Sequence, residues 1–196
     1  MTSDPHIPAP GYEVVGKYVL AERLGEGGMG EVWGAHHAQL GRDVAIKFMF
    51  ADHVESAELR DRFEREARAA ALLRTQHVVD VLDYGVDERC GRPYIVMERL
   101  EGEDLRSRLK ARGQLTPDEV LEIARQITRA LGEAHAADSV HRDRTAANVF
   151  LAQIDGAEVV KLLDFGFARV SDDTKAHTWT GVVMGSVHFM APEQAR

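Results

Sequence analysis

Two carboxylates and one amide in the second half of this 196-residue chain constrain its fold more than any other feature. Asp143 follows a basic pair, Asn148 comes next, and Asp164 precedes a glycine further along. Residues 149–154 and 157–163 have strand character and flank an Asp-Gly pair, a strong signal for a two-residue hairpin turn. A hairpin at this point would bring Asn148 and Asp164 together at its open end.

The chemistry of these three side chains suggests metal-assisted group transfer. Hard cations such as Mg²⁺ take oxygen donors, so Asn148 and Asp164 are the candidate metal ligands. Asp143 is the candidate catalytic base, or the group that orients a substrate hydroxyl. Together these residues could hold Mg²⁺ on a nucleotide and direct a hydroxyl toward it.

A glycine-rich segment near the N-terminus, with Gly25, Gly27 and Gly30, has the spacing of a phosphate-binding loop. Dinucleotide-binding loops share this spacing but open a helix, whereas residues 31–36 continue as a strand. The dinucleotide interpretation is therefore rejected. Glycines allow the backbone to approach phosphates closely because they have no Cβ. Lys47 lies in the apolar strand 44–50, where an ammonium group needs anionic partners such as phosphates.

The ordered set of motifs resembles the protein kinase family, and most closely the bacterial serine/threonine kinases related to the eukaryotic enzymes. One motif would be weak evidence, but the complete order is specific. The motifs are the glycine loop 24–32, Val44-Ala45-Ile46-Lys47, Glu66, His141-Arg142-Asp143, Asn148, Asp164-Phe165-Gly166 and Ala191-Pro192-Glu193.

The resemblance implies ATP and Mg²⁺ as cofactors and a protein hydroxyl of serine or threonine as the phosphoryl acceptor. It makes Glu66 the partner of Lys47, which would contact the α- and β-phosphates. It also implies a nucleotide pocket: a roof, a floor, a gatekeeper and two backbone groups that pair with the base. Val32 and Ala45 would form the roof over the base, Phe150 its floor, and Met97 the gatekeeper. The two backbone groups would be the Glu98 carbonyl and the Leu100 amide. Leu24 and the loop glycines would lie over the nucleotide.

The same resemblance implies regulation through the activation segment. Arg142 beside the catalytic aspartate is typical of kinases in which this arginine meets a phosphorylated loop. Thr178 and Thr180 are spaced like the phosphorylated threonines of bacterial kinases. Ser186 stands where the family has a substrate-side threonine. A merely polar loop is the alternative for these residues.

The expected fold class is α+β, a kinase-like two-lobe fold with an incomplete large lobe. Residues 1–16 are expected to be a flexible extension. Residues 17–101 form a small lobe with a five-stranded antiparallel sheet and one helix, 57–74. Residues 102–196 form a partial, mainly helical large lobe, because the chain stops three residues after Glu193. Within it, Thr116 begins a helix with a capping box, whose apolar stripe is Val120, Ile123, Ala124, Ile127, Leu131 and Ala134.

Composition limits the partners and the compartment. The net charge of -8 argues against nucleic acids and anionic membranes, which need clustered positive charge. Cys90 is the single cysteine, so no internal disulfide forms and a reducing cytoplasm fits best. No signal peptide and no apolar run of membrane-spanning length is present in the sequence.

One position departs from the family pattern and leaves alternatives open. Thr145 stands where serine/threonine kinases have a lysine that contacts the transferring phosphoryl group, so one positive charge is missing. Arg144 is adjacent to this position. The sequence is therefore compatible with an active kinase, with a pseudokinase that binds ATP without transferring phosphate, and with an inactive kinase fragment.

Overall fold

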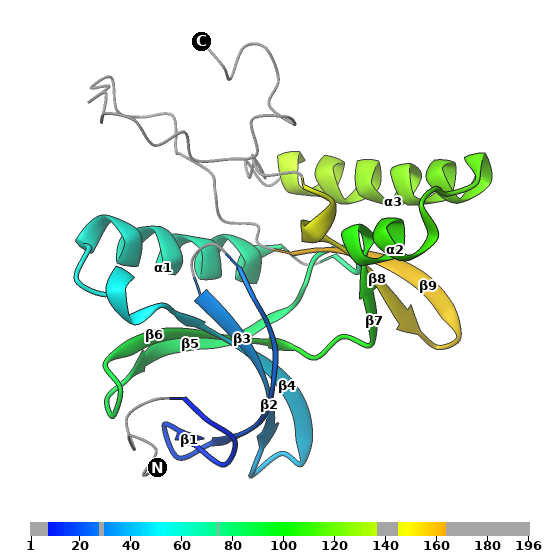
Figure 1. The fold of residues 1–196 in the computed structure, drawn as a ribbon. Coiled ribbons are helices and arrows are strands. Elements are labelled where there is room, and N and C mark those ends of the chain that lie inside the picture. Colours follow the sequence, from blue (N-terminus) through cyan, green and yellow to red (C-terminus); the bar gives the residue numbers. More distant parts are fainter. Residues whose placement is uncertain (1–7, 28–29, 74, 137–144, 164–196) are drawn as a thin grey trace, which may run out of the picture. The chain divides into compact units, whose positions relative to one another are not determined.

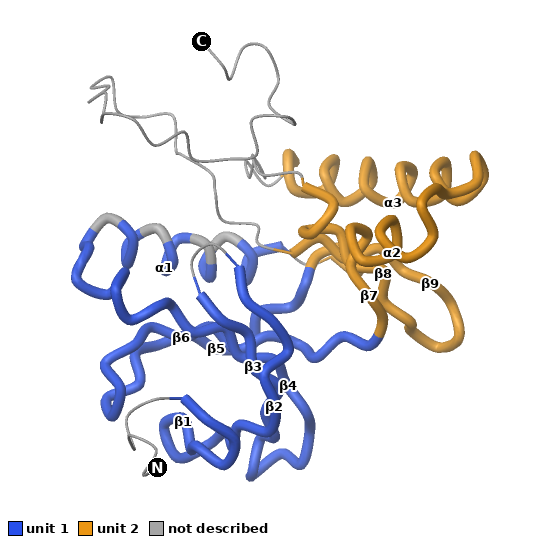
Figure 2. The backbone as a smooth tube through the Cα atoms, viewed as in Figure 1, with its two compact units in different colours: residues 1–74, 79–101 blue, residues 75–78, 102–196 orange. Residues whose placement is uncertain are grey.

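A computed structural model describes residues 8–27, 30–73, 75–136 and 145–163 of the chain (Figure 1). The chain divides into two compact units (Figure 2). Residues up to 74 and 79–101 form the first unit, and residues 75–78 together with those from 102 onward form the second. The short segment 75–78 thus belongs to the second unit, although the sequence places it within the small lobe.

The first unit contains a six-stranded antiparallel sheet with the strand order β1-β2-β3-β4-β6-β5. A 16-residue helix, α1, packs against β5 and β6. The elements are β1 (Glu13–Val14), β2 (Tyr18–Glu26), β3 (Gly30–His37), β4 (Arg42–Met49), the short helix η1 (Ala51–His53), α1 (Ala57–Leu72), β5 (Val81–Asp87) and β6 (Arg92–Glu98). The five expected strands are present, and β1 is an additional one.

The core of the first unit lies on one face of this sheet. Alternate residues of a strand point to opposite faces, so Val44, Ile46 and Phe48 of β4 share one face. They are fully buried. They pack in one cluster with side chains from β2, β3, β6 and the N-terminal segment, namely Tyr12, Val14, Tyr18, Leu20, Trp33, Ala35, Tyr94 and Val96.

The N-terminal segment is packed against the sheet from residue 8 onward, which corrects the expectation of a flexible extension through residue 16. Val14 pairs with Tyr18, and the side chains of Tyr12 and Val14 are buried in the core. The Tyr12 hydroxyl donates a hydrogen bond of 2.7 Å to Asp87 at the end of β5. The physical reason is that two large apolar side chains gain burial here, which polar and proline-rich composition does not reveal.

The second unit is built around a three-stranded antiparallel sheet, β7-β8-β9. The β8–β9 turn is the predicted one: Asp155 and Gly156 have positive φ angles of 50° and 79°, as a tight hairpin turn requires. The elements are β7 (Gly102–Asp104), α2 (Leu105–Arg112), α3 (Pro117–Ala136), the short helix η2 (Ala146–Asn148), β8 (Val149–Ile154) and β9 (Ala157–Leu162).

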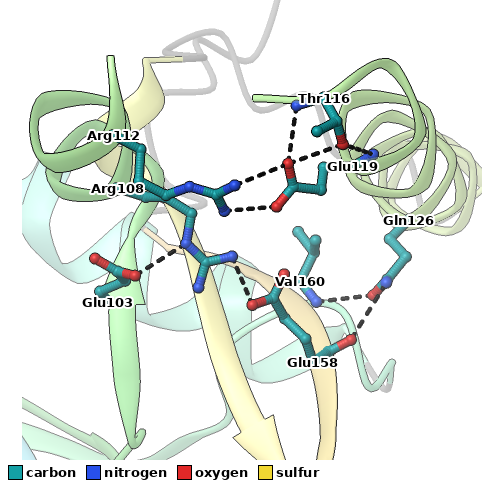
Figure 3. Close-up of polar contacts among 8 residues, drawn as sticks. All are labelled: Glu103, Arg108, Arg112, Thr116, Glu119, Gln126, Glu158 and Val160. Atoms are coloured by element: carbon teal, nitrogen blue, oxygen red, sulfur yellow. Dashed lines mark hydrogen bonds and ion pairs between the residues drawn. The ribbon is translucent and has the colours of Figure 1, made fainter. Parts of the chain in front are cut away.

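Helix α3 begins at the capping box that the sequence predicts. Thr116 Oγ1 accepts a hydrogen bond from the Glu119 amide, and the Glu119 carboxylate accepts one of 2.8 Å from the Thr116 amide (Figure 3). Arg112 from α2 also donates to this carboxylate, at 2.6 Å. The Thr116 amide, followed by Arg112, lowers the pKa of Glu119 to about 2. The carboxylate therefore stays ionised and joins the end of α2 to the start of α3.

A buried glutamine attaches α3 to the hairpin. The Gln126 side chain accepts a hydrogen bond of 2.8 Å from the Val160 amide and donates to the Glu158 carbonyl of β9 (Figure 3). The buried face of α3 therefore includes Gln126 beside Ile123, Ala130 and Ala134, while Val120 of the predicted stripe is 51% exposed. Ala124 of the predicted stripe is exposed as well.

Residues 75–78 extend the second unit at β9. The Leu162 amide donates to the His77 carbonyl, and Val78 forms a parallel bridge with Leu162. The buried His77 ring places Nδ1 3.0 Å from the Val160 carbonyl. Among the helices of the described part, none is long and apolar enough to cross a membrane.

Asp87 generates the first prediction, because its 1%-exposed carboxylate anchors the N-terminal segment. Burial acts to raise its pKa, but hydrogen bonds from Tyr12 and from the Cys90 and Val15 amides outweigh burial and lower it. We expect Asp87→Ala to reduce the free energy of unfolding by about 3 kcal/mol and Tyr12→Phe by about 1 kcal/mol. Urea unfolding followed by tryptophan fluorescence measures both.

The lowered pKa of Asp87 makes its contribution to stability depend on pH. A carboxyl whose folded-state pKa is depressed stabilises the protein above its unfolded pKa, and this contribution disappears as pH falls through the folded value. The difference between the wild type and Asp87→Ala should therefore be full at pH 7 and shrink below about pH 4. A difference that does not vary between pH 7 and pH 3 would contradict this assignment.

Candidate active site

The glycine-rich segment forms the hairpin between β2 and β3. The Gly27 amide donates a 2.8 Å hydrogen bond to the Gly30 carbonyl, and Gly25 is paired with Val32. Space is open around the Cβ positions of Gly25 and Gly27, but a Cβ on Gly30 would lie 1.9 Å from the Phe48 carbonyl oxygen. Gly30 is therefore required by packing against β4. Leu24, just before the glycines, is exposed.

Four of the predicted nucleotide-binding residues share one face of the sheet. In the antiparallel register Lys47 lies opposite Val32, and Ala45 lies opposite Met97. Directly opposed residues point to the same face, as do residues two apart in one strand. Val32, Ala45, Lys47 and Met97 consequently lie on the face opposite to the cluster containing Phe48.

Lys47 is the charged residue in this group and is only 5% exposed. An ammonium group buried to this degree requires anionic or hydrogen-bonding partners. Its predicted partner Glu66 is on α1, but the Glu66 side chain lies outside the described part of the structure. The burial of Lys47 on the face that carries Val32 and Ala45 is compatible with the phosphate-binding role predicted for this lysine.

The C-terminal end of β6 is held by the backbone of Asp80, a residue that sequence reasoning missed. The Glu98 amide donates to the Asp80 carbonyl at 3.0 Å, and the Glu98 carboxylate accepts 2.8 Å from the Asp80 amide. These two bonds fix the backbone that leads from Met97 to Leu100, whose side chain is half-buried. No local signal marks Asp80, because its role depends on a strand that follows it by many residues.

Asn148, the last residue of η2, and Phe150 of β8 lie in the second unit. The Asn148 amide donates to the Thr145 carbonyl, and the Asn148 carbonyl accepts a 2.9 Å bond from the Leu163 amide. The hairpin thus brings Asn148 beside the residue immediately before Asp164. Phe150 is half-buried and pairs with Asp104 of β7 and Lys161 of β9.

Thr145 precedes η2 in an extended conformation and is 7% exposed. Its short side chain is buried within the second unit, where η2 packs against α2 and β7. The remaining predicted site residues lie outside the described part of the structure; they are Arg142, Asp143, Asp164, Thr178, Thr180 and Ser186. No three His, Cys, Asp or Glu side chains gather as a metal site among the described residues.

Comparison with known proteins identifies the family. The protein kinase domain matches residues 18–196. Serine/threonine-protein kinase PknA of Mycobacterium tuberculosis is 39% identical over 96% of this chain and 43% of its own length. Probable serine/threonine-protein kinase PknB of Corynebacterium glutamicum is 38% identical over 94% of this chain and 29% of its own length. The chain belongs to the protein kinase family.

Solved structures agree with this assignment. The PknI kinase domain of Mycobacterium tuberculosis matches with a TM-score of 0.71 and 32% identity, over 83% of this chain and 64% of that one. The predicted kinase-like fold is therefore confirmed. The chain spans less than half of the length of the curated relatives described above.

The contrast between the loop glycines gives the second prediction. Gly30→Ala would drive a Cβ into the β4 backbone, and such overpacking costs about 2 kcal/mol of unfolding free energy. Gly25→Ala is the matched control, because its Cβ would meet no atom within 4 Å. Thermal unfolding should show a lower midpoint for Gly30→Ala alone. Equal midpoints for the two variants would show that β3 can move away from β4 at no cost.

Proposed function

We propose that this chain is the ATP-binding and catalytic portion of a serine/threonine protein kinase, which transfers the γ-phosphoryl group of ATP to a protein hydroxyl. The observation that carries this proposal is the burial of Lys47 on the sheet face shared by Val32, Ala45 and Met97. The names of the relatives, which are serine/threonine-protein kinases, support the same reaction.

In this proposal the first unit binds the nucleotide. The base lies against Val32 and Ala45 and pairs with the Glu98 carbonyl and the Leu100 amide. The hairpin of Gly25, Gly27 and Gly30, with Leu24, covers the phosphates, while Lys47, held by Glu66, contacts the α- and β-phosphates. Such fixed positive charge stabilises the nucleotide phosphates without needing to reorganise.

The second unit supplies the groups for transfer. Asn148 and Asp164 hold Mg²⁺, which neutralises charge on the phosphates when it is bound. Phe150 forms the floor under the base. Asp143 orients the serine or threonine hydroxyl of the protein substrate and takes up its proton. The β8–β9 hairpin supports this arrangement, because its ladder ends beside Asn148 and just before Asp164.

Regulation is proposed to act through the activation segment. A phosphate on Thr178 or Thr180 would add charge for Arg142 to pair with, and Ser186 would contact the substrate side of Asp143. This fits a role in bacterial signal transduction. A single cysteine supports a reducing cytoplasm as the compartment, and the charge of -8 makes nucleic acid an unsuitable partner.

A second candidate function, ATP binding without phosphoryl transfer, rests on a single residue, Thr145. Thr145 replaces the family lysine and its side chain is buried, so it places no positive charge where negative charge develops during transfer. The names of the relatives favour the active enzyme. The two candidates share nucleotide binding and differ only in the transfer step.

Nucleotide binding gives the third prediction. The chain should bind Mg-ATP, and Lys47→Met should weaken binding by about tenfold or more, because a charge-assisted contact to phosphate is lost. Methionine keeps most of the buried volume, so the fold should persist. Lys110→Met is the control, since Lys110 is exposed on α2. Titration calorimetry that detects no Mg-ATP binding to folded wild-type protein would refute both candidate functions.

Phosphoryl transfer gives the fourth prediction. Phosphate incorporation from labelled ATP into a serine- and threonine-rich protein should disappear in Asp143→Asn, because the hydroxyl loses its orienting carboxylate. Thr145→Lys should raise the rate by about tenfold or more by restoring the missing charge. Thr145→Met controls for side-chain size. A rate that does not rise in Thr145→Lys would show that another group, such as Arg144, already supplies the charge.

A further inference from the structure

An ion-pair cluster centred on the buried Arg92 lies on the sheet face opposite to Lys47. Arg92, the first residue of β6, is 7% exposed, and its Nη1 lies 2.8 Å from the Glu31 carboxylate. Its Nε donates a 2.6 Å hydrogen bond to the Met49 carbonyl at the end of β4. The other Glu31 oxygen lies 3.3 Å from Nε of Arg23 on β2. The cluster Arg23–Glu31–Arg92 thus joins β2, β3, β4 and β6.

The location of this cluster is the base of the glycine hairpin. Glu31 directly follows Gly30, and Gly30 is paired with Met49, whose carbonyl binds Arg92. One guanidinium group therefore holds both the first side chain of β3 and the β4 residue opposite the last glycine. The guanidinium carbon also lies 5.4 Å from the centroid of the Phe48 ring, which belongs to the core.

The glycine hairpin needs such support because the pairing of β2 with β3 only weakly fixes the register of the two strands. The register of β2 with β3 is interrupted twice, between Leu20 and Glu22 and between Arg23 and Gly25. Glycine-rich strands have little side-chain packing to resist slippage. The carboxylate of Glu31 compensates by linking one strand of the hairpin to Arg23 on the other, and both to Arg92.

Stability alone does not explain a cluster of this kind. Nη2 of Arg92 is buried and has no hydrogen-bond partner in the described part of the chain. Buried ion pairs are weak contributors to stability, and apolar side chains of similar size often replace them without loss. A buried arginine with an unsatisfied nitrogen is better explained by its planar guanidinium group, whose fixed donor directions hold β3 and β4 in a defined position.

We propose that Glu31 and Arg92, assisted by Arg23, are positioning residues that hold the glycine hairpin over the nucleotide phosphates. This inference rests on the proposed ATP-binding function and assigns residues to it that do not touch the nucleotide. The cluster acts through the backbone of Gly30, which is paired with Met49. Its loss should therefore weaken contacts to the phosphates and leave contacts to the base and ribose unchanged.

The test compares Mg-ATP with adenosine, which lacks phosphates, by chemical-shift titration of the full chain. Arg92→Met should raise the Kd for Mg-ATP on the order of tenfold, as weakened charge-assisted contacts do, and change the Kd for adenosine less than about twofold. Arg92→Lys keeps the positive charge but lacks the planar guanidinium group. Its Kd for Mg-ATP should lie between those of Arg92→Met and the wild type. Arg125→Met, which removes an exposed arginine of α3, is the control.

Two further variants guard against misfolding. The double variant Arg92→Met with Glu31→Gln leaves no unpaired buried charge and should reproduce the selective loss. Arg23→Met removes a partly exposed partner of Glu31. It should weaken Mg-ATP binding in the same way as Arg92→Met, but by a smaller factor. Equal losses for Mg-ATP and adenosine, or no loss for either ligand, would overturn the positioning role. Wild-type protein that binds neither ligand would overturn the proposed function, and this inference with it.

Discussion

Strand β4 is the element on which the first unit depends, because every residue from Val44 to Met49 is buried. One face of the strand carries Ile46 and Phe48 into the core, and the other face carries Ala45 and Lys47. Because the side-chain period of a strand is two, a slip of one residue would put the ammonium group of Lys47 into the apolar core. Core packing on one face therefore determines where the ammonium group of Lys47 lies on the other.

The parts of the fold that the sequence predicts correctly are those encoded by local chemistry. The Asp155-Gly156 pair adopts the positive φ angles that its residue types favour. Thr116 and Glu119 satisfy each other's backbone amides within one helical turn. In both cases the interacting groups lie within a few residues of one another, so the sequence alone identifies the partners.

The features that the sequence does not reveal depend on partners far along the chain. Asp87 binds Tyr12, and Arg92 binds Glu31, across strands that no local pattern connects. The sequence does not reveal helix α2 either, for a different reason. It has a capping Asp104 and a terminal Gly113 with positive φ, but none of its residues is buried, so it lacks the apolar stripe that identifies a helix. Its position follows from ion pairs such as that of Arg108 with Glu158 (Figure 3).

The buried charged residues of the first unit lie on both faces of one sheet. Some attach the N-terminal segment, and others fix the positions of the strands. Asp87 is held by neutral donors and fastens the N-terminal segment to the core. Arg92 and Lys47 are cations on opposite faces of the same three strands, β3, β4 and β6. Val32 of β3 lies opposite Lys47 in the strand register. Glu31, which precedes Val32 in the sequence, forms an ion pair with Arg92. Because adjacent strand residues share one backbone, the ion pair on one face constrains the residues proposed to bind nucleotide on the other.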